Sequence, residues 1–331
     1  MTAIADSRRV PSTLRWPGGA PRVAIIVLNW NGWEVTASCL ESLQQVEYPN
    51  YKIIVVDNAS TDASVERLSS GFPHIELIRN TVNLGFAAGN NVGIKRALRD
   101  GAQFILLLNN DTVVSPSFLT KMMAVAASHP RIGILNPKIS YLDDPGRIWY
   151  AGGTFNLWQG FARHIGQRAM DSARYNETRE VTFITGCAFL IKADVIAEIG
   201  LLDERFVMVC EDTDWSIRAL KANYKAMYVA DARILHRESY TIKRKTGKSI
   251  RDYYNVRNSI LLIKKHAQFY HWPSFICLLG VKLAARTGGY FLFGQFDRLR
   301  ALYRGLLHGL IPSVDDKGNL SNLSRDLSRP E

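Results

Sequence analysis

The chain has 331 residues, and its apolar content of 47% is enough to fill the core of one large domain, which excludes a disordered protein. Its four cysteines lie too far apart for a CxxC metal site and are too few for a disulfide framework, so we expect free thiols in a reducing compartment. The net charge of the chain is +11. Residues 237–310 carry a net charge of +11, whereas residues 1–236 carry +1 and residues 311–331 carry −1, and this change in charge places a domain boundary near His236.

Residues 1–21 contain no apolar stretch before their prolines and glycines, which predicts a flexible leader and not a signal peptide. The residues that follow alternate between strand-like and helix-like patterns. Residues 23–28 and 53–56 are short β-branched runs typical of buried parallel strands, and residues 33–43 between them carry apolar side chains at helical spacing. This βαβ unit predicts an α/β protein with a predominantly parallel central sheet.

The elements after this unit continue the alternation. A Gly- and Asn-rich loop within residues 80–98 passes into a helix, and residues 147–183, with scattered Gly and aromatic side chains, are expected to form hairpins or an ordered loop. The remaining strands are expected at residues 75–78, 104–108, 134–135, 189–191, 227–229 and 234–235. The remaining helices are expected at residues 116–128, 193–199 and 212–222.

Polar side chains follow four of the predicted strands, at residues 29–32, 57–62, 83–91 and 109–111. The last cluster is the clearest, because an apolar run ends abruptly on Asn109, Asn110 and Asp111. One such cluster alone is most simply a turn. Four in succession indicate a ligand site, since ligands bind at the carboxyl ends of the strands in an open α/β sheet.

The predicted site lacks the usual phosphate-binding loops. No GxGxxG follows the first strand, and no GxxxxGK[ST] is present. A nucleotide held here would need another means of binding. A carboxylate beside amides, as at Asp111, suits a hard divalent cation that keeps diphosphate oxygens and waters as its other ligands.

Six short motifs together resemble those of family 2 glycosyltransferases with the GT-A fold. In chain order they are VLNWNG, VVDNASTD, NLGFAAGNN, LLNNDT, TGCAFLIK and EDTDWSIR. The chain is most similar to the bacterial rhamnosyltransferases of cell-wall and surface-polysaccharide assembly. The resemblance covers about residues 22–240 and implies a GT-A glycosyltransferase domain there.

The resemblance also implies the site residues. The donor would be bound by Leu28, Asn29, Asp57, Gly85, Phe86, Asn91, Asn110 and Asp111, with Asp57 at the base or ribose. Asp111 would hold Mg²⁺ or Mn²⁺ with His236 as a second ligand, although Asn109 stands where a DxD motif has its first carboxylate. Asp212 would be the catalytic base, with Gly186, Cys187 and Glu211 on the acceptor side. Asp214 is instead expected to form an ordinary i,i+4 ion pair with Arg218.

The resemblance also implies an inverting, metal-dependent transfer of a sugar from a nucleoside-diphosphate donor to a hydroxyl group. The resemblance favours rhamnose from dTDP-rhamnose as donor and a polyprenyl-diphosphate-linked glycan as acceptor, at the cytoplasmic face of the cell membrane. Two alternatives remain open. The same fold could use a UDP-hexose or UDP-galactofuranose, or the protein could be a non-catalytic nucleotide-sugar or membrane-binding subunit.

The basic segment is expected to be helical at residues 249–265 and 273–308, in a membrane-associating extension at residues 241–311 before a flexible tail at residues 312–331. Lys282 and residues 286–289 interrupt its apolar runs, so neither piece is expected to span a membrane, which takes about 20 apolar residues. Basic and aliphatic side chains are interleaved, which favours peripheral binding to an anionic membrane over binding to nucleic acid. Truncation at His236 is expected to spare donor binding.

Overall fold

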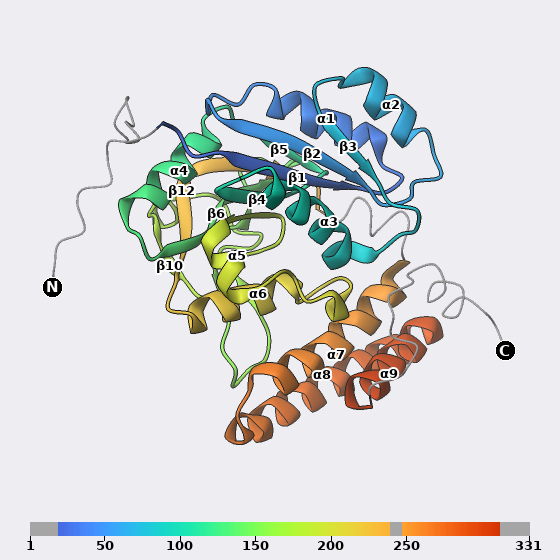
Figure 1. Ribbon diagram of the computed structural model, residues 1–331. Coiled ribbons are helices and arrows are strands. Elements are labelled where there is room, and N and C mark those ends of the chain that lie inside the picture. Colours follow the sequence, from blue (N-terminus) through green and yellow to red (C-terminus); the bar gives the residue numbers. More distant parts are fainter. Residues whose placement is uncertain (1–18, 239–246, 312–331) are drawn as a thin grey trace, which may run out of the picture.

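A computed structural model describes residues 19–238 and 247–311, so most of the predicted leader and the whole predicted tail lie outside the described residues. The body is a ten-stranded mixed sheet with helices on both faces, and three further helices pack beside it (Figure 1). The strands follow the order β10-β12-β6-β11-β4-β1-β2-β3, with β5 paired to β12 and β7 to β6. Their bounds are β1 (Val23–Asn29), β2 (Tyr51–Asp57), β3 (Glu76–Arg79), β4 (Phe104–Asn109), β5 (Thr112–Val114), β6 (Ile132–Tyr141), β7 (Ile148–Tyr150), β10 (Arg179–Val181), β11 (Ala188–Lys192) and β12 (Lys225–His236).

The half of the sheet made by β3, β2, β1 and β4 is parallel throughout, as the βαβ pattern predicts. β11 runs antiparallel to β4 and β6, whereas β12 is parallel to β6. The register places Asn29 opposite Asp57 and Leu28 opposite Asn109, so the polar strand ends meet at one edge. The expected α/β sheet is confirmed.

Helices cover both faces of the sheet. α1 (Trp33–Leu43) and α2 (Ser64–Gly71) lie on one face and α3 (Gly85–Arg99) on the other (Figure 1). The other helices of the body are α4 (Phe118–Ser128), α5 (Ala193–Ile199) and α6 (Glu211–Lys221). β1 and β4 lie between these layers with almost every side chain buried, and they form the centre of the core.

Residues 147–183 form short strands and turns, as expected. Beside β7 and β10, they contain the hairpin of β8 (Gly153–Thr154) and β9 (Arg163–His164) and the 3₁₀ turn Ala173–Tyr175. This hairpin stands apart from the main sheet and forms part of the wall of the cavity described below.

The two strands expected at residues 227–229 and 234–235 are one strand, β12. Its register on β6 shifts between Val229 and Arg233, where a bulge separates the two apolar runs. The exposed Asp231 within the bulge interrupts the hydrophobic pattern and so conceals the continuity. Beyond the bulge β12 pairs with β5, which places His236 opposite Thr112.

The basic segment folds into α7 (Gly247–His266), α8 (Trp272–Leu292) and α9 (Phe296–Leu310). The single helical stretch expected at residues 273–308 is therefore two helices, and the chain turns between them at Gly294, whose φ of +62° glycine adopts without strain. α7 packs against α9 on one side and against the body on the other, and the Lys265 Nζ atom of α7 lies 2.7 Å from Asp214 Oδ1 of α6.

The helical residues Phe269–Leu292, which comprise α8 and the turn before it, are long and apolar enough to cross a membrane. The expectation that neither apolar piece could span is therefore wrong on length and composition, because the 24-residue helix continues through Lys282 and Arg286. Almost none of it is buried against the rest of the protein. Its length and composition fit a spanning helix and also one that lies in the membrane interface.

Candidate active site

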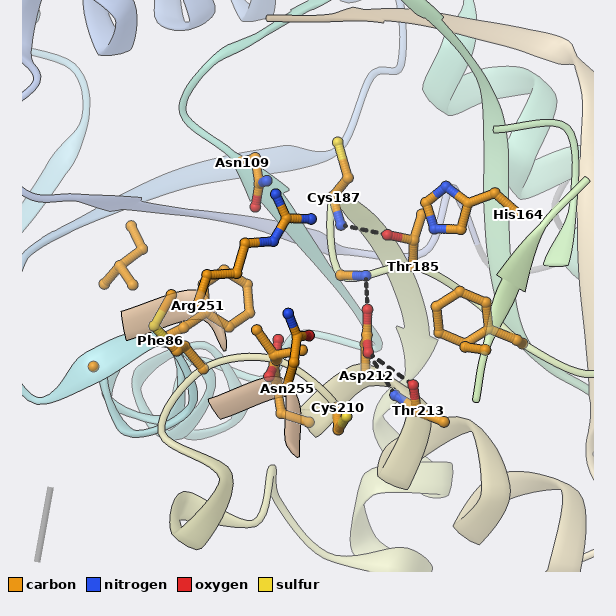
Figure 2. Close-up of a pocket in the computed structure, with 18 of the residues that line it drawn as sticks. Phe86, Asn109, His164, Thr185, Cys187, Cys210, Asp212, Thr213, Arg251 and Asn255 are labelled. Carbon is orange, nitrogen blue, oxygen red and sulfur yellow. Dashed lines mark hydrogen bonds between the residues drawn. The ribbon is translucent and has the colours of Figure 1, made fainter. Parts of the chain in front are cut away.

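A cavity of about 500 Å³ lies at the carboxyl ends of β1 and β4. Figure 2 shows Asn109 at the end of β4, Asp212 and Thr213 at the start of α6, and Arg251 and Asn255 of α7 around it. Most of the residues assigned to the site from the sequence line this cavity. They are Leu28, Gly85, Phe86, Asn110, Asp111, Gly186, Cys187, Glu211, Asp212 and His236.

Asp111 and His236 lie side by side in this cavity. The pairing of β5 with β12 places them there, because His236 lies opposite Thr112, the residue after Asp111. The Nε2 atom of His236 is 3.1 Å from Asp111 Oδ1, and their side chains are 5% and 7% exposed. Burial disfavours the charged imidazole, but the neighbouring Cys187 and Asp111 outweigh it and raise the pKa of His236 well above its usual value.

The same two side chains keep unused ligand atoms. His236 Nδ1 is buried without a hydrogen-bond partner, and Asp111 Oδ1 is buried with the His236 Nε2 atom at 3.1 Å but outside hydrogen-bond geometry. Within residues 19–238 and 247–311, no group of three or more His, Cys, Asp or Glu side chains could hold a metal ion by itself. The pair therefore fits a divalent cation that displaces the proton of His236 and is held jointly by the protein and by diphosphate oxygens and waters.

The other polar strand ends form a buried chain of hydrogen bonds behind the cavity. Asn110 Nδ2 donates to Thr36 Oγ1 at 2.8 Å, and the Thr36 hydroxyl donates to Asn29 Oδ1 at 2.8 Å. Asn29 Nδ2 donates to Asp57 Oδ1 at 2.8 Å, and Asp57 Oδ2 accepts from the Ser60 N–H at 2.9 Å. Neither Asn29 nor Asp57 lines the cavity, so the contact of Asp57 with the base or ribose stays a prediction.

Gly85 begins α3 at the edge of the cavity. Its φ is +80°, and a Cβ there would lie 2.8 Å from Val207 Cγ1, so the position requires glycine. The backbone N–H groups of Phe86 and Ala87 donate to the Val207 carbonyl oxygen at 2.7 and 3.1 Å. The start of α3 is thereby fixed to the segment that precedes α6.

Asn91 does not line the cavity, and its assignment to the pocket is a correction to the sequence analysis. Its Nδ2 donates to the carbonyl oxygen of Leu202 at 2.9 Å and to Glu204 Oε1 at 3.0 Å. Its Oδ1 accepts from the Leu202 N–H at 3.1 Å. The amide therefore holds α3 against the segment after α5.

Asp212 lies in the first turn of α6 and points into the cavity (Figure 2). Its Oδ2 accepts from the Gly186 N–H at 2.8 Å, and its Oδ1 accepts from the Thr213 N–H at 2.6 Å. Burial raises the pKa of Asp212, and these hydrogen bonds offset only part of that effect. An oriented carboxylate with raised basicity is suited to accept a proton.

Glu211 adjoins Asp212 and lines the same cavity. Its side chain is buried, and its Oε2 atom has no hydrogen-bond partner. Burial, and then the charge of Asp212, raise the pKa of Glu211 well above its usual value. Because Asp212 has backbone donors and Glu211 Oε2 has none, the pair favours a protonated Glu211 beside an ionised Asp212.

The segment that leads into α6 has a strained backbone. Val207, Val209 and Cys210 have φ values of 56°, 69° and 73°, in the left-handed region that β-branched residues rarely occupy. Asn258 of α7 holds this segment, because its Nδ2 donates to the carbonyl oxygens of Phe206, Met208 and Val209 at 2.7, 2.7 and 2.8 Å. Strained conformations persist where the surroundings fix them, so α7 helps to position Glu211 and Asp212.

α7 was expected from the sequence to contact a membrane, but it also supplies part of the cavity wall. Arg251, Asn255 and Ser259 line the cavity at four-residue intervals along one face of the helix. Figure 2 shows the Arg251 side chain extending into the cavity. The sequence contains this polar stripe at helical spacing and could have indicated a role in the site. The high net charge of the segment favoured a membrane contact instead.

The fold and the cavity define a class of protein. A nucleotide-binding sheet with a strand-end carboxylate at one part of the cavity and a helix-start acid pair at another is the arrangement of a GT-A glycosyltransferase that uses a nucleotide-sugar donor. The chain belongs to glycosyl transferase family 2, whose model, "Glycosyl transferase family 2", matches residues 24–200. The family resemblance seen in the six motifs is confirmed.

Two of the curated relatives to which this chain is similar are rhamnosyltransferases. The N-acetylglucosaminyl-diphospho-decaprenol L-rhamnosyltransferase of Mycobacterium tuberculosis is 24% identical over 75% of this chain and 86% of its own length. The dTDP-rhamnosyl transferase RfbF of Shigella flexneri is 24% identical over 68% of this chain and 74% of its own length. Two longer relatives, from Sinorhizobium fredii and Myxococcus xanthus, are each 27% identical over 68% of this chain, which spans 25% and 18% of their lengths.

Solved structures support the fold. Staphylococcus aureus TarS 1-349 in complex with UDP-GlcNAc matches with a TM-score of 0.57 at 16% identity, over 92% of both chains. The mannosyltransferase PcManGT of Pyrobaculum calidifontis, in complex with GDP-Man and Mn²⁺, matches with a TM-score of 0.52 at 15% identity, over 97% of this chain and 84% of its own. These similarities extend beyond the sheet to most of the chain.

Proposed function

We propose that the protein is an inverting, metal-dependent glycosyltransferase that moves rhamnose from dTDP-rhamnose to a hydroxyl group of a polyprenyl-diphosphate-linked glycan. One observation carries the proposal. A single cavity brings together the Asp111–His236 pair, with its unbonded ligand atoms, and the Glu211–Asp212 pair, with its raised pKa values. An inverting transfer needs these two chemistries in one place, a base for the acceptor and charge neutralisation for the leaving group.

Asp212 acts as the general base in this proposal. The acceptor hydroxyl has a very high pKa, so its proton must leave as the new bond to the anomeric carbon forms. The Gly186 and Thr213 N–H groups hold the Asp212 carboxylate in one orientation for that transfer. Glu211 stays protonated beside it and limits the negative charge in the cavity.

Asp111 and His236 hold the divalent cation on the donor side. When bound, Mg²⁺ or Mn²⁺ neutralises the charge that develops on the departing diphosphate. Asn109 contributes no charge at the first position of the DxD-like motif. Arg251 extends into the cavity from α7 and supplies a further positive charge toward the same diphosphate.

The names of two relatives support the donor and the acceptor. Both are rhamnosyltransferases, and the M. tuberculosis enzyme is named for a diphospho-decaprenol acceptor. A second candidate donor, UDP-galactofuranose, is favoured by galactofuranosyltransferase GlfT1 of M. tuberculosis, which is 23% identical over 64% of this chain and 69% of its own length. Other UDP-hexoses remain the wider alternative.

A thermal-unfolding screen tests the donor. The protein is mixed with Mn²⁺ and, in turn, dTDP-rhamnose, UDP-galactofuranose or UDP-glucose. A donor present at about 100 times its Kd should stabilise the fold by about 2.7 kcal/mol, and we expect dTDP-rhamnose to give the largest shift. A larger shift with a UDP-sugar would overturn the rhamnose assignment and leave the glycosyltransferase in place.

Asp212→Asn tests the base. We expect donor binding to be retained and transfer to fall about 10²–10⁴-fold, because the base acts on the acceptor and makes no necessary contact with the diphosphate. Slow hydrolysis of the donor without acceptor distinguishes an enzyme from a binding subunit. Loss of donor affinity in the variant, with an unchanged rate per bound complex, would make Asp212 structural.

We also infer that α8 and α9 contact an anionic membrane at its cytoplasmic face. Large apolar side chains are exposed along these helices and at the turns that flank α8. They include Phe269, Ile276, Val281, Phe291, Leu292, Phe293, Phe296, Leu307 and Leu310. Residues 269–311 carry five Lys or Arg side chains against one Asp, a net charge of +4, and this combination suits an anionic lipid surface that holds the acceptor.

A further inference from the structure

A second, more open cavity of about 720 Å³ adjoins the first. Trp149, Ala162, His164 and Arg251 line both, so the two spaces meet along this shared wall. The proposed function uses the first cavity for the donor and the reacting hydroxyl. The second has no part in that chemistry.

The second cavity gathers positive charge. Arg163, Arg174 and Arg251 line it, and Glu238 is the one acid among its described lining residues. Arg163 and Arg251 form no ion pair or hydrogen bond through their side chains with any described residue. Cations brought together without acidic partners repel one another, and an anion bound among them relieves that repulsion.

The positive charge continues from this cavity to α8. Lys282 Nζ lies 2.9 Å from the centre of the Phe161 ring, and Phe161 lines the first cavity. Burial, and then Arg286 and Arg163, lower the pKa of Lys282 to about 8. Arg163 of β9 and Arg286 of α8 therefore lie close enough to Lys282 to repel it, beside Phe161 in the wall of the first cavity, and Arg286 also pairs with Asp252 of α7 at 3.7 Å.

An exposed apolar surface adjoins the cluster of Arg163, Lys282 and Arg286. The loop before β9 packs on α8: the Ser274 hydroxyl donates to the Trp158 carbonyl oxygen at 2.7 Å, and a Cβ on Gly160 would lie 2.5 Å from the Phe275 ring. Trp158 is half exposed, and Ile276 and Val281 of α8 are exposed as well. A ligand with a charged group at Lys282 could therefore lay an apolar chain along α8.

We propose that Arg163, Lys282 and Arg286 bind the diphosphate of the acceptor, with its sugar in the first cavity and its prenyl chain on α8. The ligand class is a diphosphate ester of a long apolar alcohol. The inference rests on the proposed function for the identity of the acceptor. It assigns to these three residues a diphosphate separate from that of the donor.

Direct binding of farnesyl diphosphate to the full chain tests the site without requiring transfer. Farnesol and inorganic diphosphate are the matched probes, because each carries one half of the ligand. We expect farnesyl diphosphate to bind at least about tenfold more tightly than either, since charge and apolar contacts act together. Inorganic diphosphate that binds equally well would show a plain phosphate site, and farnesol that binds equally well would show a plain apolar one; either result overturns the proposal.

The double variant Arg163→Gln with Lys282→Gln should weaken farnesyl diphosphate binding about tenfold or more, because two charge-assisted contacts are lost. Arg163 is exposed, and Lys282 is exposed apart from its contact with the Phe161 ring, so the free energy of unfolding should fall by no more than about 1 kcal/mol. Arg99→Gln, an exposed arginine at the far end of α3, is the control and should bind normally. Arg251 is left unchanged because it also faces the donor.

The affinity for dTDP separates this site from the donor site. We expect the double variant to bind dTDP with Mn²⁺ as the unmodified protein does. An equal loss of dTDP and farnesyl diphosphate affinity would place the cluster on the donor diphosphate, and unchanged farnesyl diphosphate binding would remove its role. A negative result in the donor screen leaves the farnesyl diphosphate test intact, since that probe carries neither the donor sugar nor its nucleotide, and UDP replaces dTDP if the screen favours a UDP-sugar.

Discussion

At the scale of single residues, Asp111 lies between β4 and β5, and its buried Oδ1 atom faces His236 Nε2 at 3.1 Å without hydrogen-bond geometry. Asp111→Asn is nearly isosteric and should keep the fold, but it removes the partner of the buried His236 imidazole and should lower the free energy of unfolding by about 1–3 kcal/mol. Metal-dependent activity should fall on the order of a hundredfold or more, because a bound cation supplies several kcal/mol of transition-state stabilisation. Titration of Mn²⁺ against rate and against thermal unfolding measures both effects. Asp143→Asn removes an exposed carboxylate outside the cavity and should alter neither, and an Asp111 variant that keeps its metal response would refute the assignment.

The Glu211–Asp212 pair predicts a pH dependence. Asp212 must be ionised to accept a proton, and burial raises its pKa, so the rate should fall as the pH drops through that raised value. Glu211 stays protonated and uncharged over this range, so Glu211→Gln should leave the acid limb in place, with a modest change in the maximal rate. The pH profile of kcat measures both, and an acid limb that moved to lower pH would show that Glu211 is ionised. A loss of 10²–10⁴-fold at every pH would instead make Glu211 the base.

Sequence alone could predict residues that interrupt an apolar run, because a polar side chain at a buried strand end has few alternatives to a ligand or a turn. Asp111 and His236 were found in this way and by family resemblance, and the structure brings them together. Asn91 was misplaced because a helical amide can face either side. Its direction is set by Leu202, 111 positions away, and no local pattern encodes that contact.

At the scale of elements, the junction of α6 with α7 depends on one buried acid. Asp214 forms the predicted i,i+4 ion pair with Arg218 at 2.8 Å, which is confirmed. Its other oxygen lies 2.7 Å from both Lys265 Nζ and His266 Nε2 of α7. Burial opposes ionisation of Asp214, but His266, Arg218 and Lys265 outweigh it and hold its pKa below the usual value.

Asp214→Asn should therefore lower the free energy of unfolding by about 3–5 kcal/mol, because it leaves buried basic groups without their partner. The stabilisation by Asp214 is present above the unfolded pKa of about 3.9 and is lost as the pH falls through the lower folded value. Denaturant unfolding should show the difference at pH 7 and a smaller one in strong acid. Asp144→Asn, which breaks the exposed pair with Arg147, should cost at most about 1 kcal/mol, and equal costs would contradict the argument.

Asn258 links α7 to the acids of α6 through three carbonyl groups. Asn258→Ala should lower kcat about tenfold or more with a smaller change in the KM for the donor, since the strained segment that carries Glu211 and Asp212 loses its support. Kinetics below the unfolding temperature measure the two constants separately. Asn50→Ala removes an exposed amide and should change neither constant. A rise in KM alone would indicate a role in donor binding and not in positioning the acids.

At the scale of the whole molecule, the fold could be predicted because strands and helices that form one core carry their periodicity locally. The role of α7 in the site could not be predicted in this way. Its charge was read together with that of α8 and α9, and truncation at His236 was expected to spare donor binding. Because α7 lines the cavity and bonds the segment before α6, that truncation is now expected to impair the site itself.

The basic segment predicts how the whole protein meets a membrane. Each Lys or Arg near an anionic leaflet contributes about 1 kcal/mol, and exposed apolar side chains of α8 and α9 add a part that salt does not screen. We expect sedimentation with anionic vesicles, weakened but not abolished by salt, and little binding to neutral vesicles. Resistance to extraction by alkaline carbonate would show that α8 spans the bilayer, and tighter binding to duplex DNA than to anionic vesicles would favour the nucleic-acid interpretation.

The bulge in β12 divides that strand into two parts that tolerate changes of length differently. Before Arg233, the residues between the two register positions are already unpaired with β6, so one residue more or less can be absorbed there without moving the end of the strand. After Arg233 the pairing with β5 is continuous, and an insertion of one residue would turn the imidazole of His236 to the opposite face of the sheet. The spacing from Arg233 to His236, more than the length of the strand, therefore constrains how this part of the chain can diverge.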